Sequence, residues 1–147
     1  MNTATQDDRI IKQIIINAPA QRVFAALTDP QQRTKWWGAK GKFEVTHMES
    51  DLRPGGAWLM RGMRMGNQSF VIRGEYREVQ PPKILEFTWL PDWQEPQTIV
   101  RFDLEEKDGK TELRVTHSDF TAEFAAERYQ GWQLLLGSVK AYVEKLG

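Results

Sequence analysis

Residues 121–146, TAEFAAERYQGWQLLLGSVKAYVEKL, predict the central element of the fold. Its apolar residues recur at steps of four, three, four and three positions, at Trp132, Leu136, Val139, Val143 and Leu146. This spacing predicts a helix with one continuous apolar stripe, which must lie on another element. Thr121 is a suitable N-cap, and Glu123 near the start and Lys145 near the end complement the helix dipole. We therefore expect one long helix laid across a sheet.

The chain before this helix is predicted to begin with one strand and two short helices. Residues 9–16, RIIKQIII, are rich in β-branched apolar residues, which favour a strand, and residues 1–8 are expected to form a flexible tail. Pro19 suits the first turn of a helix that ends at the Thr28-Asp29-Pro30 break. A second short helix is predicted at about residues 30–36.

From Phe43 to His117 apolar and polar residues alternate, which is typical of strands with one covered and one wet face. Turn sequences divide this region into strands: Arg53-Pro54-Gly55-Gly56, Gly66-Asn67, Pro81-Pro82 and Asp108-Gly109. The alternation assigns the following residues to the covered face: Phe70, Ile72, Phe87, Trp89, Phe102, Val115 and His117. His47 is assigned to the covered face as well. The residues left in water are Arg73, Glu86, Arg101 and Arg114.

These elements together predict an α+β fold. One N-terminal strand, two short helices and a six-stranded meander form a curved antiparallel sheet wrapped around the long C-terminal helix. The 147 residues leave no room for a second core, so we expect residues 9–147 to form a single domain.

Composition excludes several classes of function. Lys and Arg total 20 residues and Asp and Glu also total 20, so the chain lacks the basic excess of a dedicated nucleic-acid-binding protein. The absence of cysteine removes disulfides and a cysteine nucleophile, and two histidines are too few for us to expect a metal site. No apolar run approaches the roughly 18 residues of a membrane span, and the polar N-terminus does not resemble a signal peptide. We expect a cytoplasmic protein without a cofactor.

Several short sequences follow one another along the chain in a distinctive order: Ala18-Pro19, Val23-Phe24, Leu27-Thr28-Asp29-Pro30, Trp36-Trp37-Gly38, Asp51-Leu52-Arg53-Pro54-Gly55-Gly56, Gly74-Glu75-Tyr76, Pro81-Pro82, Leu85-Glu86-Phe87-Thr88-Trp89, Thr116-His117-Ser118 and Gly131-Trp132. With the predicted order of elements, they resemble the helix-grip fold of the START and birch-pollen-allergen-like superfamily, also called SRPBCC. The local sequences are similar to the bacterial branch named after the C-terminal domain of the activator of heat-shock protein 90 ATPase. The resemblance covers about residues 9–146.

The resemblance implies a cavity between the sheet and the long helix. Members of the superfamily use this cavity for lipids, polyketides, hormones or other apolar molecules, and only some members are enzymes. A shared fold does not transfer a function, so the residues must supply the argument.

Large aromatic and apolar side chains predicted to face the long helix are the candidate ligand-binding residues. They are Trp36, Trp37, Trp58, Met60, Phe70, Phe87, Trp89, Phe102, His117, Trp132 and Leu136. The alternative is that they form a dry core. His117 is either an acid–base residue or polar anchor inside the cavity, or a structural histidine bonded to its surroundings. Arg61, Arg64 and Arg73 either steer an anionic ligand or form part of a solvated sheet face.

Three hypotheses of function follow from these residues. The first is a protein, monomeric or homodimeric, that binds an apolar or lipid-like small molecule between sheet and helix. The second is a cyclase- or hydrolase-type enzyme that uses the same cavity with His117 as acid or base. The third is a stress-related co-chaperone or protein-interaction domain. The abundance of apolar wall residues and the thin catalytic set favour the first hypothesis over an enzyme.

Overall fold

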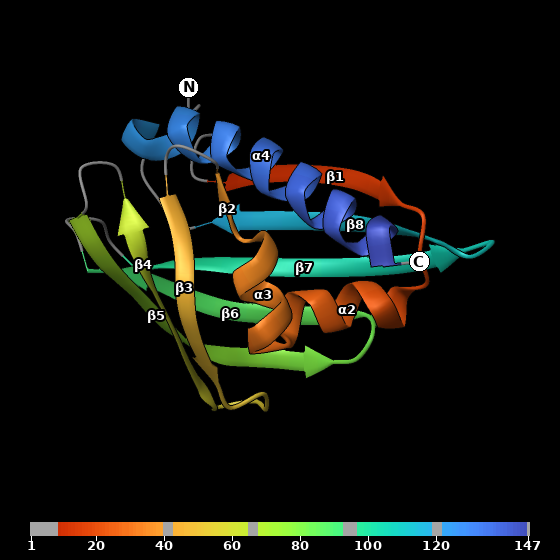
Figure 1. Cartoon of the computed structure of the whole chain (residues 1–147), viewed down its shortest axis with the longest axis horizontal. Helices are drawn as coiled ribbons and strands as arrows, with labels where there is room; N and C mark the ends of the chain where they lie inside the picture. Colours follow the sequence, from red (N-terminus) through yellow and green to blue (C-terminus); the bar gives the residue numbers. More distant parts are fainter. Residues whose placement is uncertain (1–8, 40–42, 65–67, 93–96, 119–121, 147) are drawn as a thin grey trace, which may run out of the picture.

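The computed structural model describes residues 9–39, 43–64, 68–92, 97–118 and 122–146, and the side chains of the last range from 131 to 145 (Figure 1). The elements in this part of the chain are β1 (Arg9–Ile16), α2 (Ala20–Thr28), α3 (Pro30–Trp36), β2 (Gly38–Ala39), β3 (Phe43–Ser50), β4 (Ala57–Arg64), β5 (Gln68–Gln80), β6 (Ile84–Pro91), β7 (Thr98–Lys107), β8 (Lys110–Ser118) and α4 (Ala122–Leu146). Figure 1 shows the three helices on one side of a single sheet, with α4 running beside β1. The predicted α+β helix-grip fold is confirmed.

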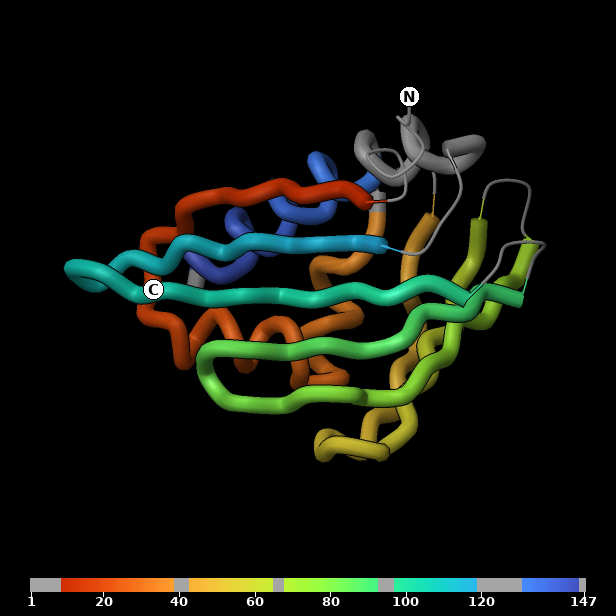
Figure 2. The backbone as a smooth tube through the Cα atoms, turned by 180° about the vertical axis from the view of Figure 1, so that it is seen from behind, coloured from red at the N-terminus to blue at the C-terminus, as the bar shows by residue number. Residues whose placement is uncertain are grey.

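The sheet is antiparallel and has the strand order β1-β8-β7-β6-β5-β4-β3-β2. Strands β3 to β8 are the predicted six-stranded meander. The N-terminal strand β1 pairs with the last strand, β8, so that Ile14 lies opposite Leu113. The two-residue strand β2, which pairs with β3, is an addition that the alternation did not predict. Figure 2 shows how strongly the sheet curves, so that its concave face wraps the helices.

The predicted division of the sheet into two faces is confirmed for β5 to β8. All the residues of these four strands that were assigned to the covered face are buried: Phe70, Ile72, Phe87, Trp89, Phe102, Val115 and His117. On the outer face Arg73 and Arg114 are exposed. Arg101 and Glu86, also expected in water, are partly buried because they pair with each other, and Arg101 pairs with Glu78 and Asp103 as well. The period of two therefore identifies the inner face of these strands.

The prediction that His47 faces inward is wrong. The pairing of β3 with β4 shifts by one residue between Val45 and His47, which is the signature of a β-bulge. After the bulge Met48 occupies the buried face, and His47 points outward with a side chain that is 51% exposed. Its Nε2 lies 2.9 Å from the carboxylate of Glu49 on the same strand. One inserted residue reverses the faces of all residues that follow it.

The two short helices join end to end through a shared residue. Pro19 precedes α2 as its N-cap, and Asp29 ends α2 and caps α3 by accepting a hydrogen bond from the backbone N–H of Gln31. Pro30 at the first position of α3 needs no backbone donor there. These caps explain why both helices start and stop where the sequence predicts.

The predicted apolar stripe of α4 faces the core. Its members Trp132, Leu136, Val139 and Val143 are buried, and Leu135 joins them. The predicted tail 1–8, the hairpin tip Gly66-Asn67 and the cap Thr121 lie outside the described residues, as do the side chains of Glu123 and Leu146.

Candidate ligand-binding site

Seven rings of the predicted ligand-binding set meet in one group between the sheet and α4. This group, called the aromatic cluster below, consists of Trp37, Trp58, Phe87, Trp89, Phe102, His117 and Trp132. Adjacent ring centroids lie 5.3 to 6.3 Å apart. Several pairs meet edge to face, which is a favourable arrangement for aromatic rings. The rings come from four strands, β4, β6, β7 and β8, from the residue that directly follows α3, and from α4.

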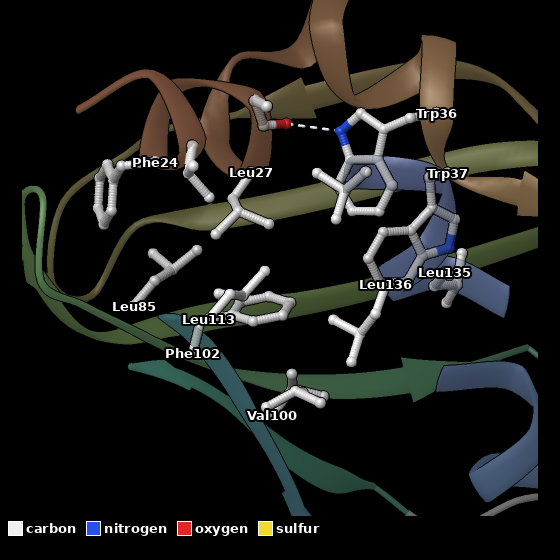
Figure 3. Packing of buried hydrophobic residues seen from close by; sticks show 14 of the residues in the cluster. Phe24, Leu27, Trp36, Trp37, Leu85, Val100, Phe102, Leu113, Leu135 and Leu136 are labelled. Carbon is white, nitrogen blue, oxygen red and sulfur yellow. Dashed lines mark hydrogen bonds between the residues drawn. The ribbon is translucent and has the colours of Figure 1, made fainter. Parts of the chain in front are cut away.

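The other predicted ligand-binding residues are also buried but surround the cluster. Trp36 contacts Trp37, and its indole N–H donates to the carbonyl oxygen of Ala26 at 2.8 Å (Figure 3). Phe70, near the start of β5, packs on Phe43 at the start of β3. Met60 and Leu136 are further members of the continuous core. The structure therefore brings eight of the predicted residues into ring contact with one another, the seven of the cluster and Trp36, and includes the others in the same core.

His117 is hydrogen-bonded through both ring nitrogens. The indole N–H of Trp132 donates to Nδ1 at 3.0 Å, and Nε2 lies 2.7 Å from the hydroxyl oxygen of Thr98. An indole nitrogen can only donate, so the proton of the neutral imidazole must be on Nε2 and point to Thr98. The Thr98 hydroxyl in turn lies 3.5 Å from the carbonyl oxygen of Trp89. This chain of bonds fixes α4 to β7 and β8.

The environment of His117 keeps it uncharged. Burial lowers its pKa from 6.5 to about 4, because a buried imidazolium loses its hydration. At neutral pH the ring therefore carries no extra proton to give to a substrate. With both nitrogens engaged, these observations favour the structural interpretation of His117.

A buried arginine that the sequence analysis did not single out lies beside the aromatic cluster. Arg33 extends from α3 and is only 1% exposed. One of its terminal nitrogens, Nη1, donates to the carbonyl oxygen of Leu27 at 2.8 Å, which satisfies a free carbonyl at the end of α2. A signal was available in the sequence, since Arg33 precedes Trp36 by three positions on one helix and so shares its buried face.

Two tryptophans of the cluster bury their indole N–H groups without an acceptor among the described residues. These are Trp58 on β4 and Trp89 on β6, whose ring centroids are 5.8 Å apart. Gly74 makes room for the indole of Trp58, because a Cβ at position 74 would lie 2.6 Å from Trp58 Nε1 and 1.9 Å from the carbonyl oxygen of Thr88. Buried donors are paired in most native structures, so such groups call for an explanation.

The arginines of β4 and β5 lie mainly on the other side of the sheet. Arg61 and Arg73 are exposed, and Arg64 is partly buried at the end of β4. A depression of about 450 Å³ opens near Arg73 and is lined mostly by outward-facing residues such as Leu59 and Leu90. This placement favours the solvated-face interpretation of Arg61 and Arg73.

Neither a metal-binding group of side chains nor a membrane-spanning helix is found in the described part of the chain. No three His, Cys, Asp or Glu side chains there are grouped so that they could hold a metal ion. None of the helices described is both long enough and apolar enough to cross a membrane.

The order of elements and the sheet topology are those of a helix-grip protein of the SRPBCC superfamily. The model of one family, described as activator of Hsp90 ATPase homolog 1-like protein, matches residues 17–144. The chain belongs to this family, and the resemblance noted in the sequence is confirmed. No curated protein is similar enough in sequence to be matched.

Several solved structures share this fold. A Chromobacterium violaceum protein shares 27% identity over 93% of this chain and 97% of its own, with a TM-score of 0.86. The AHSA1-like protein of Aeromonas hydrophila has 24% identity, covers 94% of both chains and has a TM-score of 0.77. A Nitrosomonas europaea protein has 18% identity, covers 97% of both chains and has a TM-score of 0.83. The similarity to the last two proteins shows a shared fold alone.

Proposed function

We propose that this protein binds a hydrophobic or aromatic small molecule between the concave sheet and α4. The binding residues are those of the aromatic cluster, together with Trp36, Met60, Phe70 and Leu136 around it. In this proposal the protein acts in the cytoplasm as a monomer or homodimer. A bound molecule would separate rings that now contact one another, so binding should change tryptophan fluorescence.

The observation that carries the proposal is the pair of buried indole N–H groups of Trp58 and Trp89. Leaving a buried donor without a partner costs about 1–3 kcal/mol, so a core selected only for stability would avoid two such donors side by side. A flat apolar molecule with one carbonyl or hydroxyl oxygen would use the rings as walls and accept a hydrogen bond from an indole. Ligand sites of this kind combine apolar walls with a few polar groups.

The test uses two neutral probes, 1-naphthamide and N-phenyl-1-naphthylamine, titrated against the folded protein while tryptophan fluorescence is recorded. We expect saturable binding of both. Trp58→Phe and Trp89→Phe keep an aromatic ring but remove the donor, so at least one of them should weaken 1-naphthamide binding by roughly 2- to 12-fold, the equivalent of one hydrogen bond.

Tyr142→Phe is the matched control for these variants, because it also keeps a ring and removes a hydrogen-bond donor, but at a residue outside the proposed site. The Tyr142 hydroxyl already has a partner, Oε1 of Gln32, so the variant should lower stability without changing probe affinity. Native mass spectrometry of gently purified protein should also reveal a small molecule that co-purifies. Folded protein that binds neither probe and carries no small molecule would contradict the proposal and favour the protein-interaction hypothesis.

An enzymatic role in the same place is less well supported. The enzyme hypothesis depended on His117 as acid or base, and this ring is neutral and bonded at both nitrogens. General acid–base catalysis needs a group whose pKa lies near the working pH. Binding without chemistry is therefore the function that the geometry favours.

A further inference from the structure

Arg33 holds a buried positive charge whose best binding edge is unused. Its Nη1 bonds to Leu27, but Nε and Nη2 have no acceptor among the residues that the structure describes. These two nitrogens lie on the same side of the guanidinium and form the edge that binds both oxygens of a carboxylate. Nη1 therefore stabilises the fold, whereas the Nε and Nη2 edge of the same side chain is available to a ligand.

The surroundings of this charge are aromatic rather than acidic. The Cζ atom of Arg33 lies 4.3 Å from the ring centre of Trp37, 5.4 Å from that of Phe87 and 5.8 Å from that of Trp58. No carboxylate of the described residues forms an ion pair with it. Contacts with ring faces stabilise a cation only in part, whereas a carboxylate in contact with it compensates for the water that burial removes.

Arg33 stays charged at neutral pH in this environment. Burial lowers its pKa from 12.5 to about 10, and the nearby hydroxyl of Tyr76 acts in the opposite direction. Tyr76 itself is buried, and its hydroxyl lies 2.6 Å from that of Ser50. A permanent cation is therefore present where the proposed ligand would lie.

We propose that the small molecule bound by this protein carries one anionic group of carboxylate size, which pairs with the Nε and Nη2 edge of Arg33. This inference rests on the proposed function, because it names the chemical class of the ligand for the same site. The ligand is a flat aromatic or apolar acid, with its rings against Trp37, Trp58 and Phe87 and its carboxylate on Arg33. A neutral molecule of the same shape would leave the cation without a partner.

The experiment compares 1-naphthoate with 1-naphthamide, which have the same ring system and differ in charge. Wild-type protein at pH 7 should bind the acid at least about tenfold more tightly than the amide, the range expected for a charge-assisted hydrogen-bonded pair. Arg33→Gln should bring the two affinities close to each other. Arg33→Lys keeps the charge but not the two-pronged edge, so it should retain only part of the preference.

Arg73→Gln is the control, because it removes an exposed arginine from the outer face of the sheet. Its preference for the acid should equal that of the wild type. If Arg33→Gln does not fold, the ¹⁵N–¹H signal of Arg33 Nε in the wild type replaces it, and this signal should shift with 1-naphthoate and not with 1-naphthamide.

The outcomes separate this inference from the proposed function. Equal binding of both probes by the wild type, or a preference that survives in Arg33→Gln, would overturn the role of Arg33 and leave apolar binding intact. An unchanged Arg33 Nε signal in protein saturated with 1-naphthoate would do the same. Binding of neither probe would count against both proposals.

Discussion

At the scale of single residues, the buried polar groups near the aromatic cluster divide into two kinds. His117 has a partner for each ring nitrogen, and Thr98 and Trp132 supply them. The indoles of Trp58 and Trp89 and one edge of Arg33 have none among the described residues. Groups of the first kind stabilise the fold. Groups of the second kind are available to a ligand, because burying a polar atom costs free energy unless it gains a hydrogen-bond partner.

The first kind leads to a prediction about pH. His117 has a pKa of about 4 in the folded protein against 6.5 for the free side chain, so the unfolded chain binds a proton more readily between these values. Stability should therefore be complete above about pH 6.5 and fall as the pH drops towards 4, with about 2 kcal/mol lost between pH 7 and pH 5. Chemical denaturation of wild type and His117→Gln at both pH values measures this loss. The variant should lack it, and an equal loss in both proteins would show that His117 is not the group that titrates.

At the scale of elements, α4 is held to the sheet by an apolar stripe and a few polar bonds. The stripe contributes Trp132 and Val139 to the core. The hydroxyl of Ser138 donates to the carbonyl oxygen of Trp36 at 2.6 Å, which ties α4 to the end of α3. The amine of Lys140 donates to the carbonyl oxygen of Ile15 at 2.7 Å and so reaches β1. The helix therefore joins the N-terminal strand and the two short helices to the rest of the fold.

Removing the largest side chain of the stripe should weaken this attachment. Trp132→Ala leaves a cavity at the centre of the ring contacts and deprives His117 of its donor, so we expect a loss of about 3–5 kcal/mol in the free energy of unfolding. Leu134→Ala is the control on the same helix, because Leu134 is 47% exposed, and it should change stability by less than about 0.5 kcal/mol. Denaturant titration checks both values. A loss below about 1 kcal/mol for Trp132→Ala would mean that the stripe carries little of the stability.

At the scale of the whole molecule, the proposed site joins parts that are distant along the chain. Arg33 and Trp37 come from the segment after β1, Trp58 and Phe87 from the middle of the meander, and Trp132 from the last helix. A ligand in contact with all of them would bind only the folded chain. Binding is therefore linked to global stability.

This linkage predicts that a bound ligand raises the free energy of unfolding of the wild-type protein. At a concentration 100 times its dissociation constant, 1-naphthoate should raise the free energy of unfolding of the wild type by about 2.7 kcal/mol. Denaturant titration with and without the probe measures the difference, and 1-naphthalenemethanol at the same concentration serves as the neutral comparison. The same titration on Arg33→Gln should show a much smaller gain. Equal gains for acid and alcohol would contradict the anionic class of ligand.

Local periodicity in the sequence was enough to predict several features of the fold. The steps of three and four from Trp132 to Val143 identified the buried side of α4, because a helix repeats every 3.6 residues. The alternation from Phe70 to His117 identified the inner face of four strands, because a strand repeats every two residues. Glycine and proline marked the turns, and Asp108 and Gly109 do adopt positive φ angles at the tip of the β7–β8 hairpin.

Contacts between distant parts of the chain determine which polar groups have partners. The β3 bulge turned His47 outward, and a register shift of that kind depends on pairing with β4 rather than on the strand's own pattern. The partners of His117 come from β7 and α4, and two of the three rings around Arg33 come from β4 and β6. Such contacts join residues far apart in the sequence, and local periodicity carries no information about them. For this reason the buried aromatic residues were predicted, whereas the partners of the buried polar groups were not.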